Sequence, residues 1–519
     1  MNPRPTTTSH QKTTEGEKLS SESAAITSST NLDQFAAIET QQPAARWFNR
    51  AIIFFLILFA LSVPHSIAAS QISLGLGLIG WILRDLSLRK FHIARTPIDL
   101  PLVCFMNLTV VSSLFSVEPG ISLPKLKTLV LFATIYLLAT NLRPSGVRLL
   151  TGLLILSSLV GVSFSLLEKL QGRGMIITSI ADDSPLAQSD LRPGDVIWMI
   201  ARHRVASTEE AAAIIRRHRS GEKLDIEALH AGDPVPVTLT VTDELKASSN
   251  PLGITTSGRS RQFRVSGFSR QFLTYAEQMQ ILAMLAFGGL LAGLLSQQRT
   301  KLKWLIPCSV LFALFGLALV LTASRAVIAS CILALLVTAI CAGRRAVMIA
   351  LVSALLLGAL GVYVVTSSRQ QIMANFSDDS TSRRIGYMQA GLRIIPKHPL
   401  LGVGMDSHKL HWQEWGFPGD YVTHTHSTPI QIAMDRGLLA LFCYGWLIVA
   451  LLLAAVRSFK QKSQPETQAG LFEVSLPLGV FGAVAAFSLS SLTNYNFGDS
   501  ETLTMLLFVV GLFFAANRK

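Results

Sequence analysis

The sequence of 519 residues is poor in charged and aromatic side chains. Only 15% of its residues are Asp, Glu, Lys or Arg and 8% are aromatic, whereas 50% are hydrophobic. The mean hydropathy is +0.45. One soluble core cannot hide so many apolar residues, so they must be divided among membrane spans of ~20 residues each. The composition therefore excludes a soluble globular protein and indicates a polytopic membrane protein.

Cysteine is also scarce, and the N-terminal segment has little to bury. All five cysteines fall inside apolar runs, where a buried small hydrophobe is the expected role and redox chemistry is not. Residues 1–45 are rich in Ser, Thr, Gln and Glu, which predicts a disordered cytoplasmic tail. The first apolar run begins near Ala51, too far along the chain for an ordinary cleaved signal peptide, so we expect a retained helix there.

Twelve apolar segments approach the length of a membrane span. Lys and Arg gather in every second connection between them, which places both termini in the cytoplasm and accounts for the net charge of +13 without a nucleic-acid partner. Two long connections then lie outside, at 169–270 and 367–427. The predicted spans are 49–67, 70–84, 99–116, 125–141, 146–168, 271–296, 303–322, 325–342, 346–366, 428–456, 473–492 and 502–516.

The first long outside connection reads as a small folded domain. A strand-like "MIITSI" precedes the turn formers of "DDSP", another strand follows "PGD", and Ser207 with Glu210 forms a capping box before a short helix. With "SPLAQSDLRPGDVI" at its centre, the region 172–243 closely resembles a bacterial PDZ domain. The resemblance implies that a peptide adds as a strand and that the loop Arg173, Gly174, Met175 and Ile176 receives its terminal carboxylate. The alternative is a spacer that keeps the fold and binds nothing.

A PDZ insert in a membrane protein first suggests an intramembrane protease. A metalloprotease of that kind needs His-Glu-x-x-His on a helix, and a serine enzyme needs a Gly-x-Ser-x-Gly elbow. The sequence contains no His-Glu-x-x-His, and no such elbow occurs inside a span. The motifs therefore argue against both protease classes.

The second half of the chain resembles the O-antigen ligase and O-antigen polymerase superfamily. The resemblance rests on "RVSGFSRQFLTYAEQMQILAML", "TASRAVI", "SRRIGYMQAGLRIIPKHPLLGVG" and a histidine entering the next helix, and covers roughly Arg264 to Leu439. It implies a metal-independent glycosyltransferase without a cofactor. Such an enzyme moves a glycan from an undecaprenyl pyrophosphate carrier to a hydroxyl acceptor on the outer face of the bacterial cytoplasmic membrane.

The resemblance also nominates the site residues. His426 is the expected base for the acceptor hydroxyl, because imidazole titrates in a useful range. Arg264, Arg325 and Arg384 match the family's arginines, and guanidinium groups suit a departing pyrophosphate. The chain departs from the family pattern at Ser427 and Ile430, where His-Asn followed by leucine is usual.

Each arginine also has a simpler interpretation. Arg325 can cap or snorkel at a helix end, although its lone position on the outer side favours function. Arg384 can form a loop ion pair with a neighbouring aspartate, which is as plausible as a substrate contact. Arg264 lies in a basic stretch that can meet lipid headgroups.

The histidines of the second outside connection raise the question of zinc. Imidazoles spaced as in "HKLH" and "HTH" permit a metal, but no carboxylate or cysteine completes the set. We therefore predict no metal. His398, His408 and His411 are assigned solvated or structural roles, and His424 a supporting role beside His426.

The predicted architecture is an all-α polytopic membrane bundle of about twelve transmembrane helices with an inserted α+β PDZ domain. Glycan ligation or polymerisation is the leading function; the alternatives are protein O-oligosaccharyl transfer and a non-catalytic PDZ-bearing scaffold for polysaccharide export. Expected partners are the lipid-linked donor, a glycan, lipid or protein acceptor, and a protein C-terminus at the PDZ domain. The predicted order is a cytoplasmic tail (1–45), helices one to five (46–168), the periplasmic PDZ domain (172–243), a linker (244–270), helices six to nine (271–366), a periplasmic loop (367–427) and helices ten to twelve (428–519).

Overall fold

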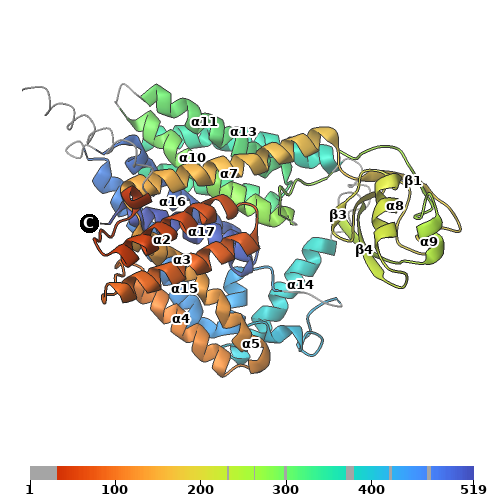
Figure 1. The fold of residues 1–519 in the computed structure, drawn as a ribbon, viewed down its shortest axis with the longest axis horizontal. Coiled ribbons are helices and arrows are strands. Elements are labelled where there is room, and N and C mark those ends of the chain that lie inside the picture. Colours follow the sequence, from red (N-terminus) through yellow and green to blue (C-terminus); the bar gives the residue numbers. More distant parts are fainter. Residues whose placement is uncertain are drawn as a thin grey trace, which may run out of the picture.

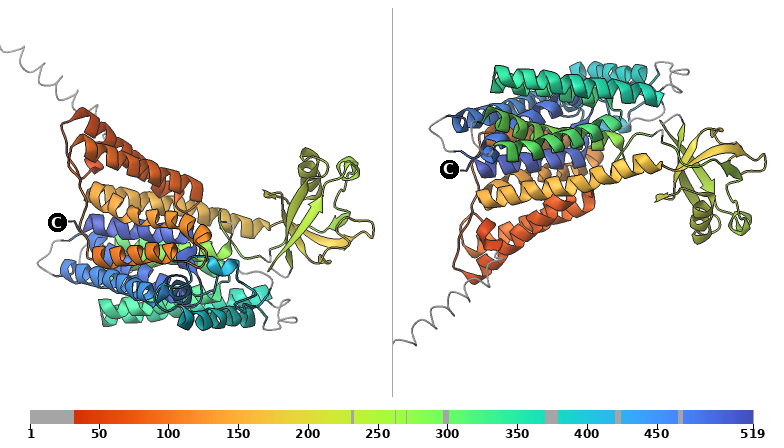
Figure 2. Two further views of the ribbon diagram at one scale, coloured as in Figure 1. Left: turned by 90° about the horizontal axis from the view of Figure 1, so that it is seen from below. Right: turned by 90° about the horizontal axis from the view of Figure 1, so that it is seen from above.

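The structure, a computed structural model, describes residues 32–230, 233–261, 263–269, 271–296, 301–369, 379–419, 424–464 and 469–518. It consists of a helical bundle with a small antiparallel sheet at one end (Figure 1). The helices of the bundle run side by side, and α7 extends beyond them to the sheet (Figure 2). The first group of helical elements is η1 (Leu32–Phe35), α2 (Pro43–Ser62), α3 (Ile67–Ser87), α4 (Asp99–Leu114), α5 (Pro119–Lys125), η2 (Leu126–Phe132), α6 (Ala133–Asn141) and α7 (Pro144–Gln171).

The second group of helices follows the sheet in the sequence. In the described part of the chain, ten helices are long and apolar enough to cross a membrane, with α5, η2 and α6 counted together, and two shorter apolar helices, α4 and α17, accompany them. All twelve predicted spans are therefore helical, although two are short. The members of this group are α10 (Phe272–Leu295), α11 (Lys301–Leu321), α12 (Arg325–Ala342), α13 (Arg344–Arg369), α14 (Asp379–Ile394), η4 (Ile395–Lys397), η5 (Ser407–Lys409), α15 (Thr428–Lys462), α16 (Leu471–Ser490), η6 (Asn496–Gly498) and α17 (Ser500–Ala516).

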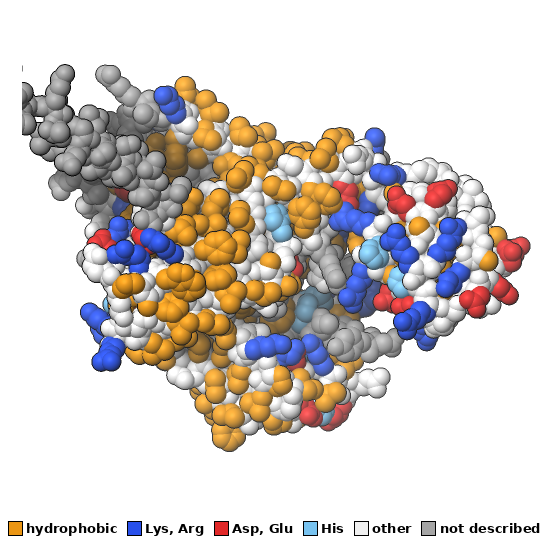
Figure 3. Space-filling model, viewed as in Figure 1, with side chains coloured by type: hydrophobic (Ala, Val, Ile, Leu, Met, Phe, Trp, Pro, Cys, Tyr) orange, Lys and Arg blue, Asp and Glu red, His pale blue; other side chains and the backbone are white. Residues whose placement is uncertain are grey.

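The bundle is built around α10 and α16, whose side chains are mostly buried. Glu277 of α10 is 1% exposed. Its carboxylate accepts hydrogen bonds from Ser490 and Asn496, which tie α10 to the turn between α16 and α17. On the face shown in Figure 3, apolar side chains are spread over the bundle, whereas charged side chains crowd the sheet region. This distribution is the one that a lipid-embedded bundle with a water-exposed appendage requires.

The sheet has six strands in the order β5-β4-β2-β1-β6, with β3 paired to β2, and each pairing is antiparallel. Ile177, Ile197 and Ile226 fill its core with Ile214 and Ile215 of the helix that packs on it. The elements are β1 (Met175–Ile180), β2 (Val196–Ile200), β3 (His203–Arg204), α8 (Thr208–Arg217), β4 (Lys223–His230), β5 (Asp233–Thr240), α9 (Asp243–Ala247) and β6 (Ile254–Thr256).

Two predicted boundaries need correction. Residues 1–31 of the predicted tail lie outside the described residues, but 32–42 are ordered against the bundle: Ala36 is buried and the Ala37 N–H donates to Asn141 O at 2.8 Å. The predicted linker 244–270 contains α9 and β6, because β6 pairs with β1 and completes the sheet. Local pattern missed both features since each depends on a distant partner.

Candidate functional site

The helix α15 is broken near its start, and the break shapes the site. Gly437 has φ 84° and ψ 170°, so the helical ladder stops there. The loop that contains "HPLLGVG" fills the gap: the N–H groups of Val403 and Gly404 donate to Met434 O and Asp435 O at 2.9 and 2.8 Å, and the Leu438 N–H donates to Pro399 O at 2.8 Å. The carbonyl groups released by the break are thus satisfied by the loop, as buried backbone groups require.

The glycines of both segments permit this close approach. A Cβ on Gly437 would lie 2.0 Å from Leu400 O, and one on Gly402 would lie 2.5 Å from the Asp435 carbonyl carbon. Only glycine fits at such distances, and both positions also have positive φ. The "HPLLGVG" motif therefore has a structural role: it locks the short first part of α15 in place.

His424 and His426 stand immediately before α15. The His426 N–H donates to His424 Nδ1 at 3.2 Å, and the two rings meet edge to face with centroids 4.3 Å apart. Tyr387 of α14 stacks on the His426 ring at 5.7 Å. His426 Nδ1 is buried and has no hydrogen-bond partner among the described residues. A ligand that reaches this nitrogen would give it the partner it lacks.

A relay from α15 fixes the chain between the two histidines. The Thr425 N–H donates to Gln431 Oε1 at 2.7 Å. Gln431 Nε2 in turn donates to both carboxylate oxygens of Asp435 at 3.0 Å. Because Asp435 adjoins the break at Gly437, the position of the histidines depends on the loop that closes the break.

Both imidazoles are neutral near pH 7. Burial, and then the neighbouring His424 and Arg384, lower the pKa of His426 to about 3. Burial likewise lowers the pKa of His424 to about 4. Desolvation and nearby positive charge both disfavour the imidazolium form, so each ring keeps a lone pair for accepting a proton.

One of the three predicted arginines, Arg384, lies near His426, and a second, Arg325, lies near Arg384. Burial, and then the charge of Arg325, lowers the pKa of Arg384. Arg384 also lowers the pKa of His426, so Arg384 is the positive charge that both Arg325 and His426 have as a neighbour. Arg325 is exposed at the start of α12.

The third predicted arginine lies beside the turn that precedes Arg325. The guanidinium of Arg264 lies 4.5 Å from the centroid of the Phe272 ring. The next residue, Val265, donates its N–H to Leu321 O at the end of α11. The structure therefore brings the segment of Arg264 to the turn between α11 and α12.

The remaining histidines of the loop are dispersed. His398 is exposed, His408 is buried 3.8 Å from an Asp435 carboxylate oxygen, and His411 pairs with Glu118 and Glu414 at 3.0 and 2.8 Å. Within the described ranges, no three His, Cys, Asp or Glu side chains form a group that could hold a metal ion.

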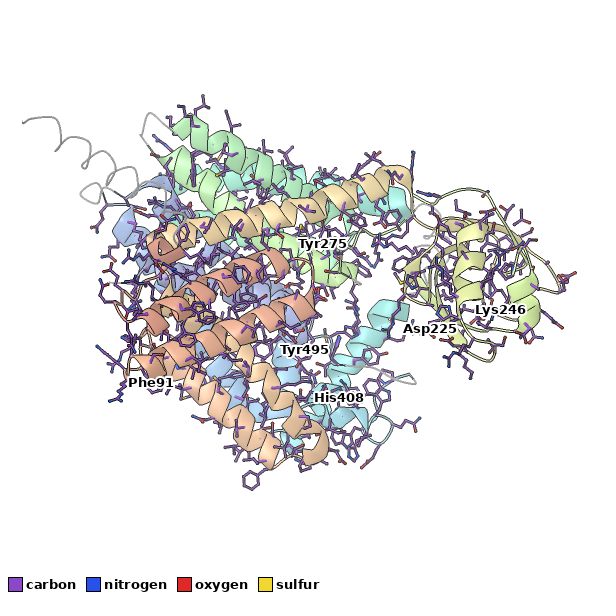
Figure 4. The ribbon with its side chains drawn as sticks, in the orientation of Figure 1. Phe91, Asp225, Lys246, Tyr275, His408 and Tyr495 are labelled. Atoms are coloured by element: carbon purple, nitrogen blue, oxygen red, sulfur yellow. The ribbon has the colours of Figure 1, made fainter. Side chains whose placement is uncertain are left out.

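A cavity of about 880 Å³ opens on the other side of His424. Its walls come from η2, the starts of α10 and α17, the turn after α2 and the first part of α15. The ring centroids of Tyr495 and His424 are 5.5 Å apart. Figure 4 shows Tyr495 and His408 within the bundle, on the side of α14 away from the sheet. Lining residues that carry charge include Lys125, Glu277, Asp406, Lys409, Asp435, Arg436, Asp499 and Glu501.

The sequence reasoning missed Gln431, Asp435 and Arg436. The signal was present, because "DRG" places two opposite charges inside an apolar run. Ionisable residues within a membrane segment are costly and mark functional sites by default.

The predicted carboxylate loop of the PDZ region is not open to a peptide. The N–H groups of Arg173 and Ile176 donate to Ser260 O and Gly258 O at 2.7 and 3.0 Å. Met175 lies in β1, an interior strand of the sheet. A Cβ on Gly174 would lie 2.5 Å from Ile197 O, so this glycine serves the packing of β1 on β2.

β6, which pairs with β1, forms one edge of the sheet. β6 occupies the end of the strand order, and Leu252 and Ile254 are buried in the same core as Ile214 and Ile215 of α8. The segment "NPLGI" precedes and enters this strand, with Gly253 at φ 60°. Among the described strands, β6 is thus a better place than β1 for an added strand.

Two family models and one curated protein match parts of this chain. Residues 310–445 match the family model described as O-antigen ligase, a range that includes Arg325, Arg384, His424 and His426 but not Arg264. Residues 158–241 match the model described as PDZ domain. Over 62 residues the chain is 39% identical to the magnetosome formation protease MamE of Magnetospirillum gryphiswaldense; the match covers 12% of this chain and 8% of that relative.

Proposed function

Starting from a chain that is an O-antigen ligase family membrane protein with a PDZ domain, we propose that it transfers or polymerises a glycan on the outer face of the cytoplasmic membrane. The donor is an undecaprenyl pyrophosphate-linked glycan and the acceptor is a hydroxyl group. The observation that carries this proposal is the neutral, part-buried His426, whose Nδ1 is unpartnered among the described residues and which lies close to Arg384.

The proposed chemistry uses these side chains directly. His426 removes the proton of the acceptor hydroxyl as its oxygen attacks the anomeric carbon of the donor. The bond between that carbon and the pyrophosphate oxygen breaks, and the lipid pyrophosphate leaves with the electron pair. Arg325 and Arg384, with Arg264 beside them, stabilise the charge that grows on the leaving group. The Asp435–Gln431 relay holds the base in position.

A deletion strain tests the proposal most directly. We expect lipid-linked glycan to accumulate and the surface glycan to be lost or shortened, and wild-type protein to reverse both changes. The chain length of the surface glycan separates a ligase from a polymerase. An unchanged lipid-linked pool in the deletion strain would contradict the proposal.

For the PDZ domain we propose capture of a protein C-terminus at the edge of β6, with the "NPLGI" segment as the carboxylate loop. The open edge of β6 and its burial against the core of α8 support this place. The full chain should bind peptides with a free C-terminal carboxylate and release them when that end is amidated. Equal binding of both peptide forms would contradict it.

A further inference from the structure

The large cavity beside His424 contains more charge than the proposed chemistry uses. Arg264, Arg325 and Arg384 do not line it, whereas Arg436, Lys125 and Lys409 do. One part of the wall is apolar, with Leu129, Phe132, Leu273, Phe497 and Leu503. The cavity can thus accept a ligand that has both polar and apolar parts.

The carboxylates of the cavity already have donors within the chain. Asp406 pairs with Lys125 and Lys409 at 2.6 and 2.8 Å, so these two lysines are also occupied. The other carboxylates accept hydrogen bonds as follows: Glu277 from Ser490 and Asn496, Asp435 from Gln431, Asp499 from Thr274 and Thr502, and Glu501 from Ser269.

Arg436 is different. The residue is 4% exposed, yet its Nε and Nη1 have no hydrogen-bond partner among the described residues. Its Nη2 faces the sulfur of Met405 at 3.0 Å, and the rings of Phe105 and Phe497 lie 6.0 and 5.8 Å from its guanidinium carbon. Asp435 and Tyr495 also interact electrostatically with the guanidinium, but neither supplies an acceptor to Nε or Nη1. A buried cation with unused N–H groups is costly. A bound anion would supply the missing acceptors.

We infer that this cavity is an oxyanion site in which Arg436 grips a phosphate or carboxylate group carried by a glycan substrate. Two adjacent N–H donors of a guanidinium match two oxygens of such a group. The inference rests on the proposed function only in taking the ligand that carries the oxyanion to be a glycan substrate. The oxyanion can belong to an acidic substituent of the acceptor or to the donor pyrophosphate. Because the arginines assigned to the donor lie outside the cavity, the geometry favours the acceptor.

Thermal unfolding of the purified full chain tests the anion site without measuring transfer. For the wild type we expect the Tm to rise with the concentration of a bound oxyanion, since a ligand stabilises the state that binds it. Arg436→Met should weaken this binding roughly ten- to a hundredfold, because hydrogen bonds to charged groups are lost. Arg345→Gln, at an exposed arginine on α13, is the matched control and should bind as the wild type does.

The Tm without ligand separates binding from a structural role. Arg436→Met removes a buried charge whose Nε and Nη1 lack acceptors among the described residues, so its ligand-free Tm should equal or exceed that of the wild type. A lower ligand-free Tm together with undiminished anion binding would overturn the site. Arg436→Lys keeps the charge but not the fork, and we expect binding between those of the wild type and Arg436→Met.

Three probes distinguish the sources of the oxyanion: glucose 6-phosphate, glucuronate and farnesyl pyrophosphate. Arg436-dependent binding of either sugar supports an acidic acceptor. Arg436-dependent binding of farnesyl pyrophosphate alone overturns that assignment and gives the site to the donor. If none of the three binds in an Arg436-dependent way, the oxyanion site itself is wrong. Binding of these probes is measured without transfer, so failure of the transfer chemistry would leave this result unaffected.

Discussion

At the residue scale, His426 combines an unusual backbone with an unoccupied ring nitrogen. Its φ is 56°, in the left-handed region that non-glycine residues seldom adopt. Such a conformation is retained only when its surroundings enforce it. Here Tyr387, His424 and the Thr425–Gln431 hydrogen bond do so. The ring is therefore held ready before any substrate arrives.

Replacement of the base is the first prediction. His426→Ala should reduce transfer roughly 10²–10⁴-fold while leaving donor binding intact, as expected for loss of a general base. His398→Ala, at an exposed histidine of the same loop, is the control and should retain full activity. Transfer to surface glycan and retention of the lipid-linked donor on the purified protein are the measurements. A fully active His426→Ala would remove the residue from the mechanism.

The pH dependence of transfer is the second prediction. Because burial lowers the pKa of His426 to about 3, the free enzyme should keep its base neutral well below the ordinary histidine pKa of about 6.5. The acid limb of kcat/KM should then lie below pH 6.5. A bound pyrophosphate raises the pKa of a nearby imidazole, so the acid limb of kcat should lie at higher pH. Coincident limbs at pH 6.5 would show that the base is solvated and unperturbed.

A third prediction concerns the shape of the positive charge. Arg325→Lys keeps one charge but loses the planar fork, so it should be nearly as harmful as Arg325→Ala if the contact with pyrophosphate is bidentate. Arg345→Lys on α13 serves as the control for a general loss of arginine. Steady-state transfer rates test whether the contact is bidentate. Wild-type activity of Arg325→Lys would mean that Arg325 acts only as a point charge or as a topology signal.

At the element scale, the broken α15 explains what the sequence could and could not predict. Composition and run length located the apolar helices, ten of them long enough to cross a membrane in the described part of the chain, because hydrophobic length is a local property. The run 428–456 looked continuous, however, since its break depends on a loop whose Val403 and Gly404 pair with Met434 and Asp435.

Prediction of the site residues from the sequence is limited in the same way, because their roles depend on contacts between distant segments. His426 and the three arginines were nominated by resemblance. By contrast, the roles of Gln431, Asp435 and Arg436 appear only when the loop closes on the helix. In the sheet, the strand β6 escaped notice because three residues of an edge strand have no periodicity to detect and are defined by their distant partner β1.

The break itself gives the fourth prediction. Gly437→Ala should displace the "HPLLGVG" loop, because its Cβ would meet Leu400 O and its positive φ is strained for alanine, at a cost of about 1–3 kcal/mol. Gly445→Ala in the same helix meets nothing within 4 Å and is the matched control. We expect a lower Tm and lower transfer for the first variant only. Equal behaviour of the two variants would contradict the locking role of the loop.

At the scale of the whole molecule, an ionic contact fixes the sheet to the bundle. Glu168 near the end of α7 accepts two hydrogen bonds from Arg173, at 3.0 and 2.6 Å, and pairs with Arg204 of β3. Arg173 also lies over the rings of Trp198 and Phe263, at 4.8 and 4.3 Å. The contact sets the direction in which the sheet projects from the bundle.

The fifth prediction follows from that contact. Glu168→Gln should leave both parts folded but broaden the distribution of their relative orientations, because the charge that holds two arginines is removed. Pulsed electron spin resonance between labels at positions 246 and 303 measures it, with Glu244→Gln on exposed α9 as the control. An unchanged distribution for Glu168→Gln would mean that the aromatic contacts of Arg173 alone hold the sheet.

The chain enters and leaves the sheet region at a single pair of residues, Arg173 and Ser260, which form an isolated β-bridge. The Arg173 N–H donates to Ser260 O at 2.7 Å and the Ser260 N–H donates to Arg173 O at 3.1 Å, so the two crossing points lie side by side. The two chain connections between the sheet and the bundle therefore lie next to each other. Because Arg173 and Ser260 are paired, a deletion of residues 173–260 would join two chain ends that already lie side by side.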